Sequence, residues 1–129
     1  MRQVKPEILI FSVYQAGRRD DSNQDNHQCI VNRLTQLNIG HKVLDGVYQN
    51  QTEKSILVSA DRIDMVQNLC QQFGQECYLR SDSERNTFLV YPNGTEKRIG
   101  TLKRVSKEDA LKLDGYSIDN TDGSFWAAV

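Results

Sequence analysis

The apolar run at residues 7–15, EILIFSVYQ, most constrains what this chain can fold into. It is almost continuous and contains β-branched and aromatic residues, which is typical of a strand that is covered on both faces. Two amphipathic stretches follow it, each separated from the next by strand-like segments. We therefore expect a sheet with this run at its centre and two helices packed against it.

The first helix is expected to begin after Asp21 or Ser22, because either side chain can accept a hydrogen bond from a free backbone N–H. Gly40 is expected to end it. A second helix should begin at Asp61 and end at Gly74. Apolar side chains recur at helical spacing in both helices and predict their core faces: Ile30, Val31, Leu34 and Leu37 in the first, and Ile63, Val66, Leu69, Cys70 and Phe73 in the second.

Further strand-like segments lie at 41–49, 53–60, 76–81, 87–92 and 95–104. Asn93 and Gly94 separate the last two segments and predict a type I′ turn, because both residues tolerate positive φ. Ser106 is expected to cap a short helix over 106–113. A terminal strand should then dock Phe125 and Trp126.

The order of elements through residue 81 is β-α-β-β-α-β, which predicts a ferredoxin-like sheet. The whole chain, residues 1–129, is expected to form a single α+β domain with an added C-terminal β-hairpin and short helix. We take the strand at 53–60 to run parallel to the first strand. This direction would place Glu53 at the end of the sheet opposite to the loop that leaves the first strand.

Composition excludes several classes of protein. The net charge of −1 gives no large positive field of the kind that nucleic-acid and membrane-surface proteins use. No apolar run approaches the roughly 20 residues that span a bilayer, so a soluble, cytoplasmic protein is expected. The three cysteines are an odd number without tight spacing, and we expect free, largely buried thiols.

The sequence offers no clear metal or cofactor site. His27 and His41 are the only histidines, and neither has a second ligand at metal-binding spacing. No glycine-rich phosphate loop and no nucleophile motif occur. We therefore predict no cofactor and no metal, although Asp20, Asp21 and Glu53 leave a metal-dependent hydrolase open as an alternative.

Two polar stretches are candidate contact surfaces. The segment AGRRDDSNQDNHQ at 16–28 carries Arg18, Arg19 and Asp20 between the first strand and the first helix. The stretch 95–107 is basic, and its cations could touch phosphates, which leaves a nucleic-acid-binding module open as a second alternative. The cations in question are Lys97, Arg98, Lys103 and Arg104.

Several short motifs resemble, in their order, an uncharacterised family of small phage and bacterial proteins of unknown function. They are Asn23 in SNQD, RLTQLNIG at 33–40, Glu53 and Ser55 in EKSILV, Gln75 in FGQECYL and the later NGTEKRIGT, roughly over residues 7–105. The resemblance implies a phage or mobile-element setting and carries no activity. It adds Asn23, Glu53 and Gln75 to the candidate binding residues.

Each of these three residues also has a structural explanation. Asn23 can cap the first helix, Glu53 can accept a hydrogen bond in the hairpin turn, and Gln75 can bond backbone where the second helix ends. The function that the sequence favours is a small non-enzymatic, phage-encoded accessory protein. It would act in the host cytoplasm by binding a host protein through the polar loop and the basic hairpin.

Overall fold

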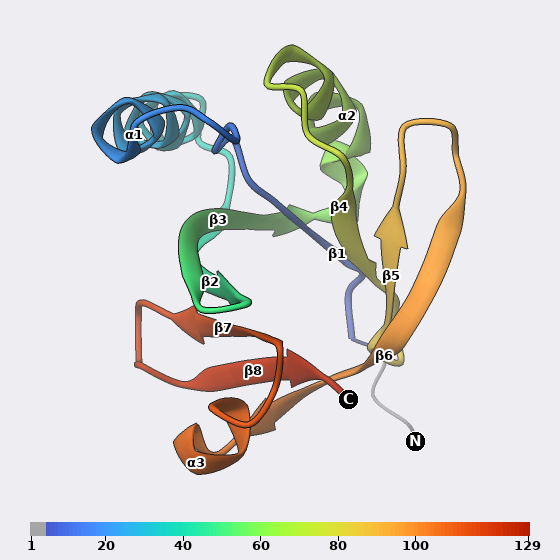
Figure 1. Cartoon of the computed structure of the whole chain (residues 1–129). Coiled ribbons are helices and arrows are strands. Elements are labelled where there is room, and N and C mark those ends of the chain that lie inside the picture. The colour runs from blue at the N-terminus through green and yellow to red at the C-terminus, as the bar shows by residue number, and fades with distance from the viewer. Residues whose placement is uncertain (1–4) are drawn as a thin grey trace.

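A computed structural model describes residues 5–129 of the chain. The helices are α1 (Asp20–Gln36), α2 (Ile63–Gln72) and α3 (Lys107–Ala110), with a 3-10 turn, η1 (Ala60–Arg62), before α2. The strands are β1 (Ile8–Phe11), β2 (His41–Tyr48), β3 (Gln51–Ser59), β4 (Tyr78–Ser81), β5 (Asn86–Val90), β6 (Glu96–Val105), β7 (Gly115–Asp119) and β8 (Phe125–Ala128) (Figure 1).

The strands form a closed barrel in the order β1-β3-β2-β7-β8-β6-β5-β4. Every neighbouring pair is antiparallel, including β4 with β1, which closes the ring. The predicted ferredoxin-like α+β fold is therefore wrong. The segments expected to be an appended hairpin and tail instead bridge β4 to β2, and this closure leaves no free sheet edge among the described strands.

The direction of β3 also differs from the prediction. β3 runs antiparallel to β1, with Phe11 opposite Ile56 and Ile8 opposite Ser59. The beginning of β3 therefore lies beside the end of β1, where the chain leaves for α1. Glu53 is at this end of the barrel and not at the opposite one, which brings it to the same region as the loop after β1.

The main core lies between the barrel wall and the two longer helices. Figure 1 shows α1 and α2 together at one end of the molecule, above β1 and β3. In β1, Leu9 and Phe11 are fully buried. The strand and helix side chains of this core are Leu9, Phe11, Val13, Ile56, Val58, Tyr78 and Val90 together with Ile30, Leu34, Val66 and Cys70.

Gly74, with φ of 62°, follows the end of α2 as predicted, but three other helix ends differ from the prediction. α1 begins at Asp20, and its N-cap residue, Arg19, makes no side-chain cap hydrogen bond. Asp20 and Asp21 lie in its first turn, where carboxylates interact favourably with the helix dipole. At the other end Asn38, with φ of 58°, takes the left-handed position that was assigned to Gly40. Asp61 lies inside η1 and caps nothing with its side chain.

Three side chains that were expected in the core are exposed. Leu37 and Ile63, at the ends of their helices, are 62% and 36% exposed. Cys29 is also exposed, whereas Cys70 is buried and Cys77 is half-buried. Burial raises the pKa of the Cys70 thiol to about 11, and burial likewise raises the pKa of Cys77. Cys29 is thus the thiol that solvent reaches.

The type I′ turn occurs in a different hairpin from the one that the sequence predicted. Between β2 and β3, Gln49 and Asn50 both have positive φ, which a type I′ turn requires. Between β5 and β6, only Gly94 has positive φ, and its N–H donates to the carbonyl of Tyr91, so the predicted type I′ turn is wrong there. Ser106 caps α3 as predicted, since its Oγ accepts from the N–H of Asp109 at 3.1 Å.

None of the helices within residues 5–129 has both the length and the apolar character needed to cross a membrane.

Gly100 should be intolerant of a side chain. Its φ is 143°, and a Cβ there would lie 2.7 Å from the backbone nitrogen of Val129. We expect Gly100→Ala to lower the free energy of unfolding by about 1–3 kcal/mol, because strain and a backbone clash add. Urea denaturation measures this loss.

Gly40→Ala is the matched control, because nothing lies within 4 Å of a Cβ at Gly40. Equal stabilities of the Gly100→Ala variant and the wild type would show that β6 and the final strand do not approach each other as described.

Candidate functional site

The loop between β1 and α1 is held by side chains rather than by regular backbone pairing. Ser12 lies just after β1, and its Oγ donates to the carbonyl of Lys54 at 3.1 Å. The same oxygen accepts from the backbone N–H of Tyr14 at 3.0 Å. Ser12 therefore fastens the beginning of this loop to β3.

Asn23 fastens the next part of the loop to α1. It is buried, and its Oδ1 accepts from the N–H of Gln15 at 2.8 Å. Its Nδ2 donates to the carbonyls of Gln15 at 3.2 Å and Arg18 at 3.5 Å. Asn23 lies inside the helix and does not cap it, so the predicted capping role is wrong. Its side chain holds the loop backbone instead.

Gln75 reaches the same loop from the segment that follows α2. Its Nε2 donates to the carbonyl of Tyr14 and, at 3.4 Å, to the carbonyl of Phe73. Gly74, with φ of 62°, turns the chain just before it. Two of the three residues singled out by the resemblance thus hold adjacent residues of one loop.

This loop buries two side chains, Val13, which joins the main core, and Tyr14. The ring of Tyr14 meets the ring of His27 edge-on, with centroids 6.3 Å apart. Burial raises the pKa of Tyr14, and the carboxylates of Asp20, Asp45 and Glu53 raise it further, against a backbone hydrogen bond with Lys54 that lowers it. The phenol therefore stays protonated at neutral pH, and it lies within electrostatic reach of Glu53.

The strand position opposite Glu53 carries no side chain. The direct cross-strand partner of Glu53 is Gly46, and paired residues of antiparallel strands share a face. A Cβ at Gly46 would lie 3.2 Å from the Oγ of Ser55 and 3.3 Å from the carbonyl oxygen of Glu53, so the position favours glycine. The residue opposite Glu53 therefore adds no side chain to the face that carries the Glu53 carboxylate.

The charge of Glu53 is not matched by a neighbour. It makes no hydrogen bond or ion pair with another residue within 5–129. Surrounding protein atoms raise the pKa of its carboxyl, although the residue as a whole is exposed. The carboxylate is therefore open to solvent while nearby protein atoms partly desolvate it.

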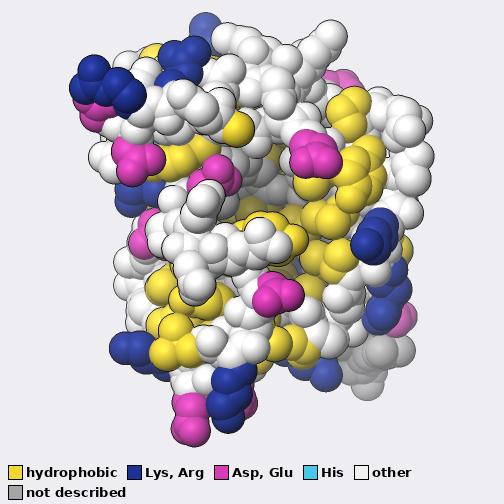
Figure 2. Space-filling view, in the orientation of Figure 1, with side chains coloured by type: hydrophobic (Ala, Val, Ile, Leu, Met, Phe, Trp, Pro, Cys, Tyr) yellow, Lys and Arg dark blue, Asp and Glu magenta, His cyan; other side chains and the backbone are white. Residues whose placement is uncertain are grey.

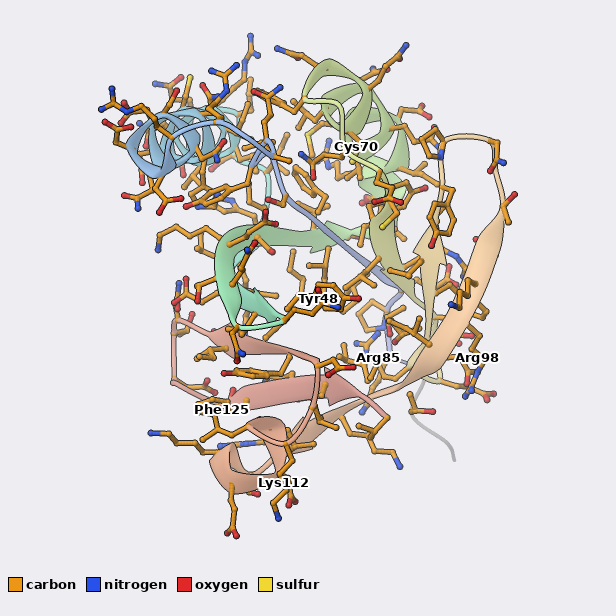
Figure 3. The ribbon with its side chains drawn as sticks, viewed as in Figure 1. Tyr48, Cys70, Arg85, Arg98, Lys112 and Phe125 are labelled. Carbon is orange, nitrogen blue, oxygen red and sulfur yellow. The ribbon has the colours of Figure 1, made fainter. Side chains whose placement is uncertain are left out.

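Figure 2 shows a hollow near the middle of the face drawn, with hydrophobic side chains along it and Asp and Glu side chains around it. Figure 3 shows Tyr48, at the end of β2, pointing into the central part of this view above β7 and β8. Tyr48 is 64% exposed, and its ring would contact a Cβ at Gly115. The hairpin that carries Glu53 therefore also brings an exposed aromatic ring to this face.

Two of the other ionisable groups near Tyr14 carry no unbalanced charge. Lys54 Nζ lies 3.5 Å from a carboxylate oxygen of Asp45. His27 is buried, and burial, followed by the charge of Lys54, lowers its pKa, so the ring is neutral. Its Nδ1 has no hydrogen-bond partner among the described residues. Glu53 and Asp20 are therefore the carboxylates of this group that have no ion pair among the described residues.

The predicted contact residues of the first loop do not converge on Glu53. Arg18 and Arg19 are exposed and donate to neighbours in α1, to Ser22 and to Asp21 respectively. Asp20 opens the helix and acts on Tyr14 only through its charge. No three His, Cys, Asp or Glu side chains of residues 5–129 are grouped so as to hold a metal ion, so Asp20, Asp21 and Glu53 do not form the predicted hydrolase centre.

The basic residues of β6 lie in two adjacent pairs along the strand. Lys97 and Arg98 are consecutive, as are Lys103 and Arg104, and successive side chains of a strand point to opposite faces. Arg98 is further tied to Asn86 at 3.0 Å and to Thr101 at 3.3 Å.

Another depression lies beside α3, at the end of the molecule away from α1 and α2 (Figure 1). Arg104 and Lys107 give it positive charge, and it is open to solvent. It holds none of the side chains around Tyr14. The candidate site is therefore the group at the end of β1.

Tyr14, His27 and Gly46 are members of this group that sequence reasoning missed. A lone glycine inside a strand pattern indicates close approach of another group, so Gly46 could have been noticed. Tyr14 and His27 carry no such local signal, because an aromatic residue and a histidine at buried spacing are ordinary core residues.

Replacing Glu53 by glutamine should stabilise the fold at neutral pH. A carboxyl with a raised pKa in the folded state favours folding when protonated and loses that contribution as pH rises through the folded pKa. The wild type therefore carries a cost at pH 7 that Glu53→Gln removes. We expect a higher melting temperature for the variant at pH 7 and a difference that shrinks as pH falls toward 4. A lower melting temperature for the variant at pH 7 would mean that Glu53 has a stabilising partner.

Comparison with known proteins identifies the family but gives no match among curated proteins. The family model for the S-Adenosylmethionine lyase family matches residues 9–129. A lyase is an enzyme, so the prediction of a non-enzymatic phage accessory protein of unknown function is wrong, and the nucleic-acid and hydrolase alternatives also differ from this family. Because the match spans nearly all of the barrel, the chain belongs to the S-adenosylmethionine lyase family.

Proposed function

We propose that this chain cleaves S-adenosylmethionine at a carbon–sulfur bond of its sulfonium group without adding water. The family match supports the substrate and the class of reaction. The observation that carries the proposal is the Glu53 carboxylate, which has no ion-pair partner among the described residues and lies opposite Gly46 on β2. A cationic substrate supplies the charge that this carboxylate lacks.

The chemistry of the substrate indicates which of its two positively charged groups Glu53 contacts. The sulfonium charge disappears as the carbon–sulfur bond breaks, because the bonding electron pair goes to sulfur and leaves a neutral thioether. A carboxylate held against the sulfonium would stabilise the ground state more than the transition state and would slow the reaction. The ammonium group of the amino-acid arm keeps its charge throughout. Glu53 therefore serves best as a partner for this ammonium group.

The amino-acid arm is also the part of the substrate that can react without water. Loss of a β-hydrogen, or attack of the arm's own carboxylate on the γ-carbon, breaks the bond between that carbon and sulfur. The first route passes the proton to solvent and leaves an unsaturated amino acid, and the second forms a carbon–oxygen bond and leaves a lactone. In both, the bonding pair goes to sulfur and 5′-methylthioadenosine is released. A site that fixes the ammonium group and excludes water from this arm lowers the entropic cost of both routes.

Binding of a host protein by Arg18, Arg19 and the basic residues of β6 is a separate matter. It remains a prediction from sequence and is not needed for the proposed reaction.

The purified chain should convert S-adenosylmethionine to 5′-methylthioadenosine, detected by liquid chromatography with mass spectrometry. Glu53→Gln should raise KM by about 10- to 100-fold and change kcat less, because it removes a contact that is equal in the ground and transition states. Glu108→Gln, on α3 at the other end of the molecule, is the matched control and should leave both constants unchanged.

Two results would contradict this proposal. Absence of turnover by the wild-type chain, or release of methionine in place of the thioether nucleoside, would exclude the proposed cleavage. A fall in kcat at constant KM for Glu53→Gln would instead assign Glu53 to proton removal and refute the ammonium contact.

A further inference from the structure

The backbone of Tyr14 and Gln15 is held to an unusual degree for a loop. The N–H of Tyr14 donates to Ser12, and its carbonyl accepts from Gln75. The N–H and the carbonyl of Gln15 both bond the amide of Asn23. All four backbone polar groups of these two residues thus have side-chain partners, where a surface loop ordinarily relies on water.

The partners come from three separate parts of the chain. Ser12 follows β1, Asn23 belongs to α1 and Gln75 follows α2. Asn23 is 4% exposed, and both ends of its amide are used, so none of its polar atoms is left buried without a partner. A satisfied buried amide is rigid, because breaking one bond leaves a desolvated group behind.

The group held by these contacts is Tyr14. Its ring packs edge-on against His27, and Ser12, which accepts from its backbone N–H, also bonds the carbonyl of Lys54, the residue after Glu53. Neither Asn23 nor Gln75 makes a printed contact with Glu53 itself. Any effect of these two amides on the proposed reaction must therefore pass through the position of Tyr14.

We propose that Asn23 and Gln75 are positioning residues that fix the Tyr14 hydroxyl beside Glu53, where it donates a hydrogen bond to the carboxylate of the substrate's amino-acid arm. Glu53 and Tyr14 then hold the two ends of this arm, the ammonium group and the carboxylate group. The inference rests on the proposed function, since it assigns residues to the same substrate. It explains why a loop beside an uncompensated carboxylate is tied by polar side chains from three elements.

A purely structural role for Gln75 predicts a different outcome from a positioning role. If Gln75 only stabilises the fold, removing it lowers stability and affects activity equally with or without the Tyr14 hydroxyl. If it acts through Tyr14, removing it matters only while that hydroxyl is present. A double-mutant cycle separates the two cases, because it measures the dependence of one substitution on the other.

The experiment compares kcat/KM for S-adenosylmethionine in the wild type, Gln75→Ala, Tyr14→Phe and the double variant. We expect each single substitution to lower kcat/KM by about tenfold and the double variant to lose no more than the larger single loss. Melting temperatures are measured in parallel, and activities are taken well below them. Gln67→Ala is the matched control, since Gln67 lies on α2 and donates to the hydroxyl of another tyrosine, Tyr78, at 3.5 Å. It should leave kcat/KM unchanged.

A second cycle pairs Asn23→Asp with Tyr14→Phe. The aspartate retains the acceptor for the N–H of Gln15 but loses the donor, so the loop is loosened without a cavity. Multiplicative losses in both cycles, or unchanged activity in Gln75→Ala, would overturn the positioning role while leaving the cleavage reaction intact. A wild-type chain that does not cleave S-adenosylmethionine would remove the proposed function and this inference with it.

Discussion

The pairing of β1 on both of its edges is the constraint on which the rest of the structure depends. β1 is four residues long, yet it bonds β3 on one side and β4 on the other, and the second pairing closes the barrel. Two residues of this strand, Leu9 and Phe11, pack in the core beneath α1 and α2. The chain then leaves β1 directly into the loop that holds Tyr14. The barrel, the main core and the candidate site therefore meet at a single short strand.

Local sequence patterns predicted the elements near this strand better than they predicted the barrel. The continuous apolar run identified β1, and helical spacing identified Ile30, Leu34, Val66 and Cys70 as core residues. Closure depends on pairings between distant segments, such as β2 with β7 and β6 with β8, and no local pattern specifies their register. Both ends of α1 were mistaken, because the helix begins without a side-chain cap and Asn38, rather than Gly40, takes the left-handed position after it.

In the candidate site, too, some residues were predicted from the sequence but their arrangement was not. Asn23, Glu53 and Gln75 were singled out from short motifs, and all three lie at the end of β1 where the chain enters α1. Their proximity was not predictable once β3 had been given the wrong direction. Tyr14 was hidden within an apolar run, and its role became visible only through the side chains that bond its backbone. The absence of a catalytic motif argued against an enzyme, because a single carboxylate opposite a glycine has no recognisable sequence motif.

The different exposure of the three cysteines makes Cys29 a selective labelling site in the native chain. Cys29 is exposed on α1, the helix that carries Asn23 and His27, whereas Cys70 is buried and Cys77 half-buried, both with raised pKa. Alkylating reagents attack the thiolate form of an accessible cysteine, so a fluorophore added at neutral pH would be directed to Cys29. Labelled there, the native chain would report on movements of α1 when substrate enters, without any engineered substitution.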